Sequence, residues 1–185
     1  MRFIKTILSI QVTVAVFVFL GAYFDVADLP YFESHYVHED GLIEWLTFVA
    51  HLSTFSLCVW RLLHYQGRFF SLFNLSLILI GCIFFFGAGE EISWGQRIFN
   101  LQSPEFFLRH NTQGEINIHN LILGNLKVNR LIFGTIKGIV VAIYFLIIPI
   151  IYERLIWAQN MLDSCAIPIP DFSLISFYIL MATVI

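Results

Sequence analysis

Charged residues are scarce in this sequence, and no stretch of it is rich in lysine or arginine. Only 12% of its residues are charged, and the formal net charge is −3. An average soluble protein carries about 25% charged residues. Nucleic-acid-binding proteins, and proteins that hold acidic lipids through a polybasic tract, depend on basic clusters. Their absence here argues against a nucleic-acid partner.

Cysteine is also rare. Cys58, Cys82 and Cys165 lie far apart, and none has the paired spacing of a zinc or redox motif. Two of them fall inside apolar runs, so we interpret all three as packing or lipid-facing residues. A catalytic thiol is not expected.

Apolar residues are in excess, at 58% of the sequence. A bilayer span needs about 20 mostly apolar residues. Four stretches reach this length: 3–24, 42–64, 69–89 and 132–152. A fifth apolar stretch begins at Phe172 and runs to Ile185. The sequence therefore predicts an all-α, polytopic transmembrane helix bundle in the lipid bilayer, with four full spans and a partial fifth.

We expect residues 1–185 to form a single membrane domain that is truncated at its C-terminus, because the fifth stretch is too short to cross as a straight helix. A re-entrant segment is the alternative. The first span has a longer apolar region than a signal peptide, so we interpret it as an uncleaved anchor. Residues 90–130 are expected to form an extramembrane loop that carries polar site residues.

The distribution of lysine and arginine in short loops favours a cytoplasmic N-terminus. The supporting residues precede the first span or flank the second loop: Arg2, Lys5, Arg61 and Arg68. Lys127 and Arg130, just before the fourth span, oppose this orientation. In either orientation the start of the second span, the end of the third and the loop 90–130 share one side of the membrane.

The second span carries Glu44 and His51, seven residues and about two helical turns apart, so both point the same way. Charged residues within a membrane are costly and tend to be paired and functional. We therefore predict that Glu44 is a catalytic acid–base residue and that His51 belongs to the same site. The alternative is that Glu44 reaches the lipid headgroups and that His51 bonds to a neighbouring helix.

The third span ends in the segment GAGEEISWGQRIF. If the helix continues, Glu90, Trp94 and Arg97 share one face, and Glu91 points about 100° away. We interpret Glu90, Glu91 and Arg97 as acid–base or charge-stabilising residues and Trp94 and Gln96 as substrate contacts. The two carboxylates should differ: the one that faces Glu44 and His119 is expected to be functional, and the other to pair with Arg97 or solvent. Two solvated acids at the interface are the alternative.

The loop segment NTQGEINIHN contains a series of alternating polar residues: Asn111, Gln113, Glu115, Asn117 and His119. They line one side if the segment is extended, and Glu115 meets His119 if it is helical. We predict that Gln113, Glu115 and Asn117 bind substrate. A hydrated loop with helix-capping asparagines is the alternative.

These polar groups are expected to converge because they fall on one membrane side. Carboxylates and imidazoles together suit a divalent metal such as zinc, which activates a bound water for hydrolysis. His51 and His119 are the predicted metal ligands. The sequence contains no HExxH motif and no close histidine pair.

Three segments, EDGLIEWLTFVAH, EEISWGQRIF and NTQGEINIHN, resemble a group of functionally uncharacterised bacterial multi-span membrane proteins over residues 39–121. The resemblance implies the inner (plasma) membrane of a bacterium. In its residue types, though not in a shared motif, the sequence is also remotely similar to alkaline-ceramidase-like membrane hydrolases. In that family, acidic and histidine residues hold a zinc ion that cleaves a lipid amide, and the family's late histidine pair is absent here.

We therefore predict a membrane-embedded, metal-dependent hydrolase of a lipid or lipid-linked substrate, and glycosyl transfer to a lipid carrier would use similar carboxylates. One alternative is a transporter of a cation or small solute. It is less favoured because the spans are plain apart from His51, Lys137 and some hydroxyl residues, and no inverted repeat is visible. A structural subunit of a membrane complex is a further alternative.

Overall fold

The computed structural model describes residues 2–36, 41–65 and 70–184. They form two compact units: Met1–Ile43 with Pro170–Ile185, and Glu44–Ile169. Arg68, one of the residues that favour a cytoplasmic N-terminus, lies outside the described residues, as do Glu39 and Asp40 in the first loop. The orientation of the chain across the membrane therefore stays a prediction.

The first unit is built around two apolar helices. It contains α1 (Arg2–Ala27), α2 (Leu29–Tyr31), the π-helical segment η1 (Phe32–Tyr36) and α9 (Phe172–Ala182). Helices α1 and α9 are in contact, and the buried Gln11 amide of α1 donates to the Ser173 hydroxyl of α9 at 3.2 Å. Polar pairs of this kind join helices where no water competes.

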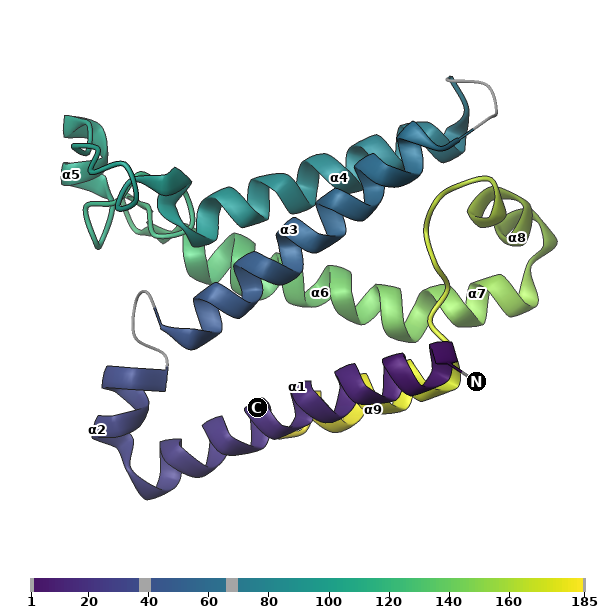
Figure 1. The fold of residues 1–185 in the computed structure, drawn as a ribbon, viewed down its shortest axis with the longest axis horizontal. Helices are drawn as coiled ribbons and strands as arrows, with labels where there is room; N and C mark the ends of the chain where they lie inside the picture. Colours follow the sequence, from purple (N-terminus) through teal and green to yellow (C-terminus); the bar gives the residue numbers. More distant parts are fainter. Residues whose placement is uncertain (1, 37–40, 66–69, 185) are drawn as a thin grey trace. The chain divides into compact units, whose positions relative to one another are not determined.

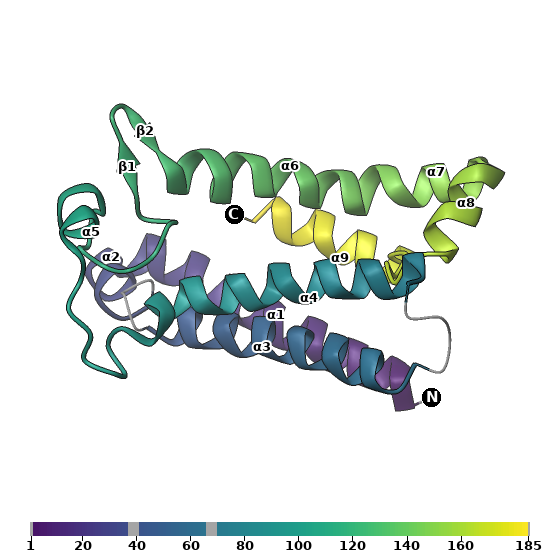
Figure 2. The ribbon, with the colours of Figure 1, turned by 90° about the horizontal axis from the view of Figure 1, so that it is seen from above.

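The second unit begins with an antiparallel helix pair, α3 (Leu42–Leu63) and α4 (Leu72–Glu91) (Figures 1 and 2). Helix α4 starts where the Ser71 side chain accepts from the Asn74 N–H at 3.2 Å, as an N-cap does. The two helices approach closely at Gly81 of α4, where an added Cβ would lie 3.4 Å from the Cβ of Cys58. Small residues at such crossings are typical of helix pairs in membranes.

The fourth span is one continuous helix with two π-helical stretches. Its parts are η3 (Asn129–Ile136), α6 (Lys137–Ala142), η4 (Ile143–Ile147) and α7 (Ile148–Arg154), and α8 (Ile156–Asp163) follows. Pro149 lies in the first turn of α7, directly after η4. Proline has no N–H to continue the α-helical pattern, which explains the irregular stretch before it.

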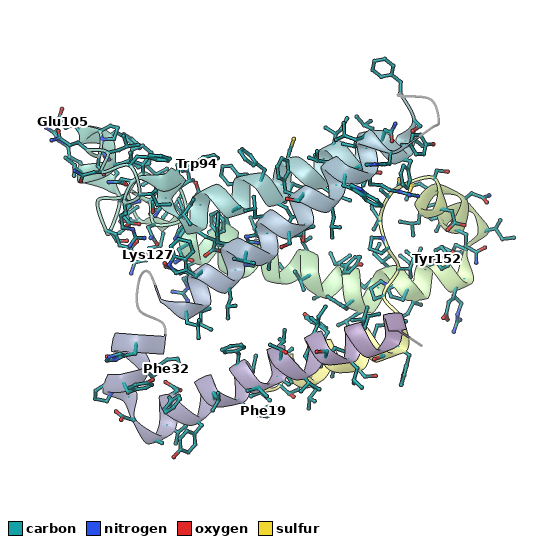
Figure 3. The ribbon with its side chains drawn as sticks, in the orientation of Figure 1. Phe19, Phe32, Trp94, Glu105, Lys127 and Tyr152 are labelled. Carbon is teal, nitrogen blue, oxygen red and sulfur yellow. The ribbon has the colours of Figure 1, made fainter. Side chains whose placement is uncertain are left out.

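The segment between α4 and η3 gathers at one end of the second unit (Figure 1). It contains the short helix η2 (Ser93–Gly95), α5 (Glu105–His110) and the antiparallel strands β1 (Ile122–Leu123) and β2 (Leu126–Lys127). Figure 3 shows Trp94, Glu105 and Lys127 at this end and Tyr152 at the opposite one. The start of α3, the end of α4 and the start of η3 therefore share one side, as predicted.

The membrane architecture predicted from hydropathy is confirmed. Among the described residues, four helices are long and apolar enough to cross a bilayer: Ile7–Ala27, Leu42–Leu63, Leu72–Glu91 and Asn129–Arg154. The shorter apolar helix Phe172–Ala182 is the partial fifth. Many large apolar side chains on these helices are exposed in the isolated chain, as lipid-facing side chains are. The chain is an all-α integral membrane protein.

Candidate functional site

Helix α4 ends at Glu91, because the chain then turns through a left-handed conformation. Ser93, Trp94 and Gly95 have φ angles of 47°, 55° and 76°. This region is unfavourable for residues other than glycine and persists only where surrounding contacts stabilise it. Because the helix stops here, Arg97 does not continue the helical face of Glu90, as an unbroken helix would require.

Trp94 folds back over α4 and supplies part of that stabilisation. Its indole Nε1 donates to the Glu90 carboxylate at 2.9 Å. An added Cβ at Gly89 would lie 2.8 Å from the indole ring, so only glycine leaves room for it. Trp94 is thus a contact to α4, and its predicted role as a substrate contact stays untested.

Glu90 ties the end of α4 to a loop nearly thirty residues later in the chain. It is only 2% exposed. Its Oε2 accepts from the backbone N–H of Ile118 at 2.7 Å and of His119 at 2.9 Å, and the His119 Nδ1 lies 3.5 Å from the same oxygen. With Trp94 on Oε1, both carboxylate oxygens are occupied. Such charge-assisted bonds are stronger than neutral ones, which suits Glu90 to hold the loop in place.

Glu115 is the second carboxylate enclosed by the loop. It accepts from the Ser93 hydroxyl at 2.5 Å and from the Asn117 amide at 3.0 Å. Arg97 forms an ion pair with it at 3.4 Å. Arg97 therefore pairs with Glu115, a residue of the loop. The sequence had instead predicted Glu90 or Glu91 as its partner. The left-handed turn explains the difference, because it directs Arg97 away from the α4 axis.

Asn117 lies at the centre of this loop and is 1% exposed. Its amide N–H groups donate to Ser93 and Glu115, and its side-chain oxygen accepts from the Asn111 amide at 2.8 Å. The Asn111 oxygen in turn accepts from the N–H groups of Gln113 and Glu115. The segment is therefore neither extended nor helical but a turn closed on its own asparagines. We call Glu90, Ser93, Asn111, Glu115 and Asn117 the polar loop network.

Two glutamines extend the polar loop network. The Gln96 side chain accepts from the Ile116 N–H at 2.7 Å and donates to the Ser103 hydroxyl at 2.6 Å. The Gln113 oxygen accepts from the Asn120 amide. The polar groups of the predicted substrate-binding residues Gln96, Gln113, Glu115 and Asn117 thus make contacts within the protein. Ser103 and Asn120 were missed in the sequence, which gives no local sign of their roles.

Glu91 differs from its neighbour. Within the described part of the chain its carboxylate forms no hydrogen bond and no ion pair, and it is half-buried. His119, Glu44 and Lys137 are near enough to interact with it electrostatically. Glu91 is thus the carboxylate near Glu44 and His119, and within residues 2–36, 41–65 and 70–184 no group donates a hydrogen bond to it.

His51 of α3 packs against α4 at Gly87, which lies one helical turn before Glu91. Its ring lies against Gly87, where an added Cβ would be 3.1 Å away, and 5.5 Å from the Phe84 ring centre. Its Nδ1 is buried and has no hydrogen-bond partner among the described residues. The position of His51 below the two glutamates is the one that the α3–α4 hairpin predicts.

Lys137 is an additional charged residue near these groups. It lies in the fourth span, eight residues after Asn129 and thus ~12 Å along the helix, and its charge acts on both Glu91 and His51. The sequence does signal this residue, since lysine within a span is costly and tends to be functional. We call Glu44, His51, Glu91, His119 and Lys137 the open cluster.

A metal site is not assembled by these side chains. Among the described residues, no three histidine, cysteine, aspartate or glutamate side chains lie close enough together to hold a metal ion. Both oxygens of Glu90 already accept hydrogen bonds. His51 and His119 as metal ligands, and zinc as the metal, therefore stay predictions.

The chain was compared with known proteins. No protein-family model, no curated protein and no solved structure matches it. The resemblances to uncharacterised bacterial membrane proteins and to alkaline-ceramidase-like hydrolases thus stay predictions from the residues. Function has to be inferred from the geometry of the site.

Proposed function

We propose that the protein hydrolyses a lipid or lipid-linked substrate at the membrane surface, with Glu91 as the general base. The observation that carries this proposal is the contrast between two adjacent carboxylates. Glu90 is saturated by hydrogen bonds, whereas Glu91, at the end of a membrane span, accepts none from the described residues and lies near His119 and Lys137. A general base needs an oxygen that can reach a water molecule.

The proposed reaction consumes one water molecule and includes two successive proton transfers. Glu91 takes a proton from a water molecule while the water oxygen forms a bond to the carbonyl carbon or phosphorus of the substrate. The negative charge that develops on the substrate oxygen is stabilised by the Lys137 ammonium. When the bond to the leaving oxygen or nitrogen breaks, that atom receives the proton from Glu91.

A lipid-like substrate is supported by apolar side chains that surround the polar loop network. Ile98, Phe99 and Leu108 are 61%, 71% and 63% exposed, although they belong to the segment outside the spans. Exposed apolar groups next to a membrane span favour contact with acyl chains. The substrate would then approach the open cluster from the bilayer.

The test is an activity screen of the purified protein in detergent micelles. It is incubated with three substrate classes, a phospholipid, a ceramide-type lipid amide and an isoprenoid-linked diphosphate, and the products are identified by mass spectrometry. We expect Glu91→Gln to lower the rate at least about a hundredfold, the usual contribution of a general base. The matched control is Glu105→Gln, an exposed glutamate at the same end of the unit. If no class is cleaved, or if both variants act alike, the proposal is wrong.

The same preparation tests whether the protein binds a metal. Elemental analysis of the active protein would reveal a bound transition metal in a fixed ratio to the chain. A stoichiometric metal would support the metal-dependent form of the prediction. Full activity after treatment with a chelator would support catalysis by side chains alone.

Transport of a cation or of protons is a second candidate function, because two ionisable residues lie within membrane spans. Lys137 and His51 lie inside spans, and the buried Nδ1 of His51 has no partner among the described residues. Ionisable groups inside spans are typical of proton relays. In sealed vesicles, a transporter would dissipate a pH gradient, and Lys137→Met would abolish this flux. A hydrolase without transport would leave the gradient intact.

A further inference from the structure

The turn before β2, β2 itself and the first turns of the fourth span line a shallow hollow that the proposed hydrolysis does not use. It has a volume of about 480 Å³ and is open on one side. Its lining residues are Lys127, Asn129, Arg130, Gly134 and Thr135. An adjoining hollow of about 330 Å³ shares Lys127 and Arg130 and adds Asn125, Leu126 and Leu131. The strand pair projects beside the start of the helix in Figure 2.

The hollow has the chemistry of an anion site. Lys127 and Arg130 bring two positive charges three residues apart, and no carboxylate is among the lining residues. Neither side chain forms an ion pair with a described residue. Asn129 and Thr135 add an amide and a hydroxyl. Arginine is suited to planar, bidentate recognition of phosphate, and lysine binds it as a point charge.

Hydrogen bonds order the backbone that carries the two cations. Lys127 is paired with Ile122 in the strand register, and the Val128 N–H donates to the Leu121 carbonyl at 3.0 Å. On the helix side, the Thr135 hydroxyl donates to the Arg130 carbonyl at 3.1 Å. The backbone of the hollow is therefore ordered by the protein itself, and Lys127 and Arg130 are exposed on it, where a ligand can reach them.

We propose that this hollow binds the phosphate of an anionic phospholipid headgroup. The helix that is long and apolar enough to cross a bilayer begins at Asn129, so Lys127 and Arg130 are at the end of a span, where headgroups are expected. Leu126 and Leu131 in the adjoining hollow are exposed and available to the glycerol and acyl region. A basic pocket beside a span is a recognised arrangement for lipid headgroups. The shared chemistry is phosphate, and its position favours a lipid over a soluble anion.

The test measures lipid binding directly by native mass spectrometry of the protein in a neutral detergent. Phosphatidylglycerol and phosphatidylcholine are titrated separately. We expect tighter binding of phosphatidylglycerol, and a loss of about fivefold in its affinity for Arg130→Gln, since a basic residue near an anionic surface contributes roughly this factor. The matched control is Arg154→Gln, which removes the same charge at the opposite end of the same span. It should change the affinity less than twofold.

A competition experiment distinguishes the phosphate of a lipid headgroup from a soluble phosphate. Inorganic phosphate and glycerol phosphate are added as competitors, and Lys127→Gln serves as a second variant in case Arg130→Gln does not fold. Displacement of the lipid only by millimolar competitor supports a headgroup site. Glycerol phosphate that binds as tightly as the whole lipid would overturn the lipid assignment. Equal binding of the two lipids, or equal effects of Arg130→Gln and Arg154→Gln, would overturn the site. None of these measurements depends on hydrolytic activity.

Discussion

The polar loop network and the open cluster lie next to each other at the end of α4, yet their carboxylates differ in how many hydrogen bonds they accept. In the network, Glu90 and Glu115 are each enclosed by several hydrogen-bond donors. In the cluster, Glu91 is influenced by charges but forms no hydrogen bond within the described residues. Two glutamates that are adjacent in sequence thus have different surroundings: Glu90 binds the loop backbone, and Glu91 is the residue for which we propose a role in chemistry.

The largest effect is expected at the centre of the polar loop network. Asn117→Ala removes four side-chain hydrogen bonds, to Ser93, Asn111, Glu115 and the Asn120 N–H. Because several buried polar groups each lose one hydrogen bond, the free energy of unfolding should fall by about 3–4 kcal/mol. Thermal unfolding in detergent measures this change. Asn160→Ala, an exposed asparagine in α8, is the control and should have almost no effect.

The next prediction compares the adjacent glutamates directly. Glu90→Gln weakens three hydrogen bonds to a buried carboxylate and should cost about 2–3 kcal/mol. Glu91→Gln removes no hydrogen bond, so its effect on stability should remain below about 0.5 kcal/mol. Unfolding curves of the two variants, recorded side by side, test the division. Equal losses would remove the distinction between network and cluster.

A smaller effect is expected where α4 makes room for the indole of Trp94. An added methyl at Gly89 meets this ring at 2.8 Å, so Gly89→Ala should push Trp94 aside and cost about 1–3 kcal/mol. At Gly138 an added methyl has nothing within 4 Å. Gly138→Ala is therefore the control and should leave the unfolding temperature unchanged or slightly raised. A Gly89→Ala variant as stable as this control would show that Trp94 does not fasten the turn.

The smallest effects are expected for the two arginine pairs. Arg109 and Glu105 form an exposed pair one turn apart in α5, so Arg109→Gln should change stability by about 0–0.5 kcal/mol. Arg97 is more enclosed and pairs with the buried Glu115. Arg97→Gln should therefore cost more than Arg109→Gln, as measured by thermal unfolding at low and high salt. The reverse order would mean that the network does not need this charge.

Much of the candidate site follows from residue type and membrane side. Glu44, Glu91 and His119 were expected to share one place because they fall on one membrane side, and a common role for them stays a prediction. The ion-pair partner of Arg97 and the conformation of residues 111–120 could not be predicted from the sequence. Both depend on the left-handed turn at Ser93 to Gly95, and a propensity-based interpretation does not anticipate such a turn at serine and tryptophan.

The sequence by itself determined the membrane spans, because the ability of about 20 apolar residues to cross a bilayer is a local property that needs no tertiary partner. Only the tertiary structure decided which of Glu90 and Glu91 is enclosed. That difference requires the N–H groups of Ile118 and His119, nearly thirty residues away, to meet one carboxylate and not the other. The physical reason is that hydropathy acts over each segment alone, whereas hydrogen-bond saturation depends on how distant segments fold onto each other.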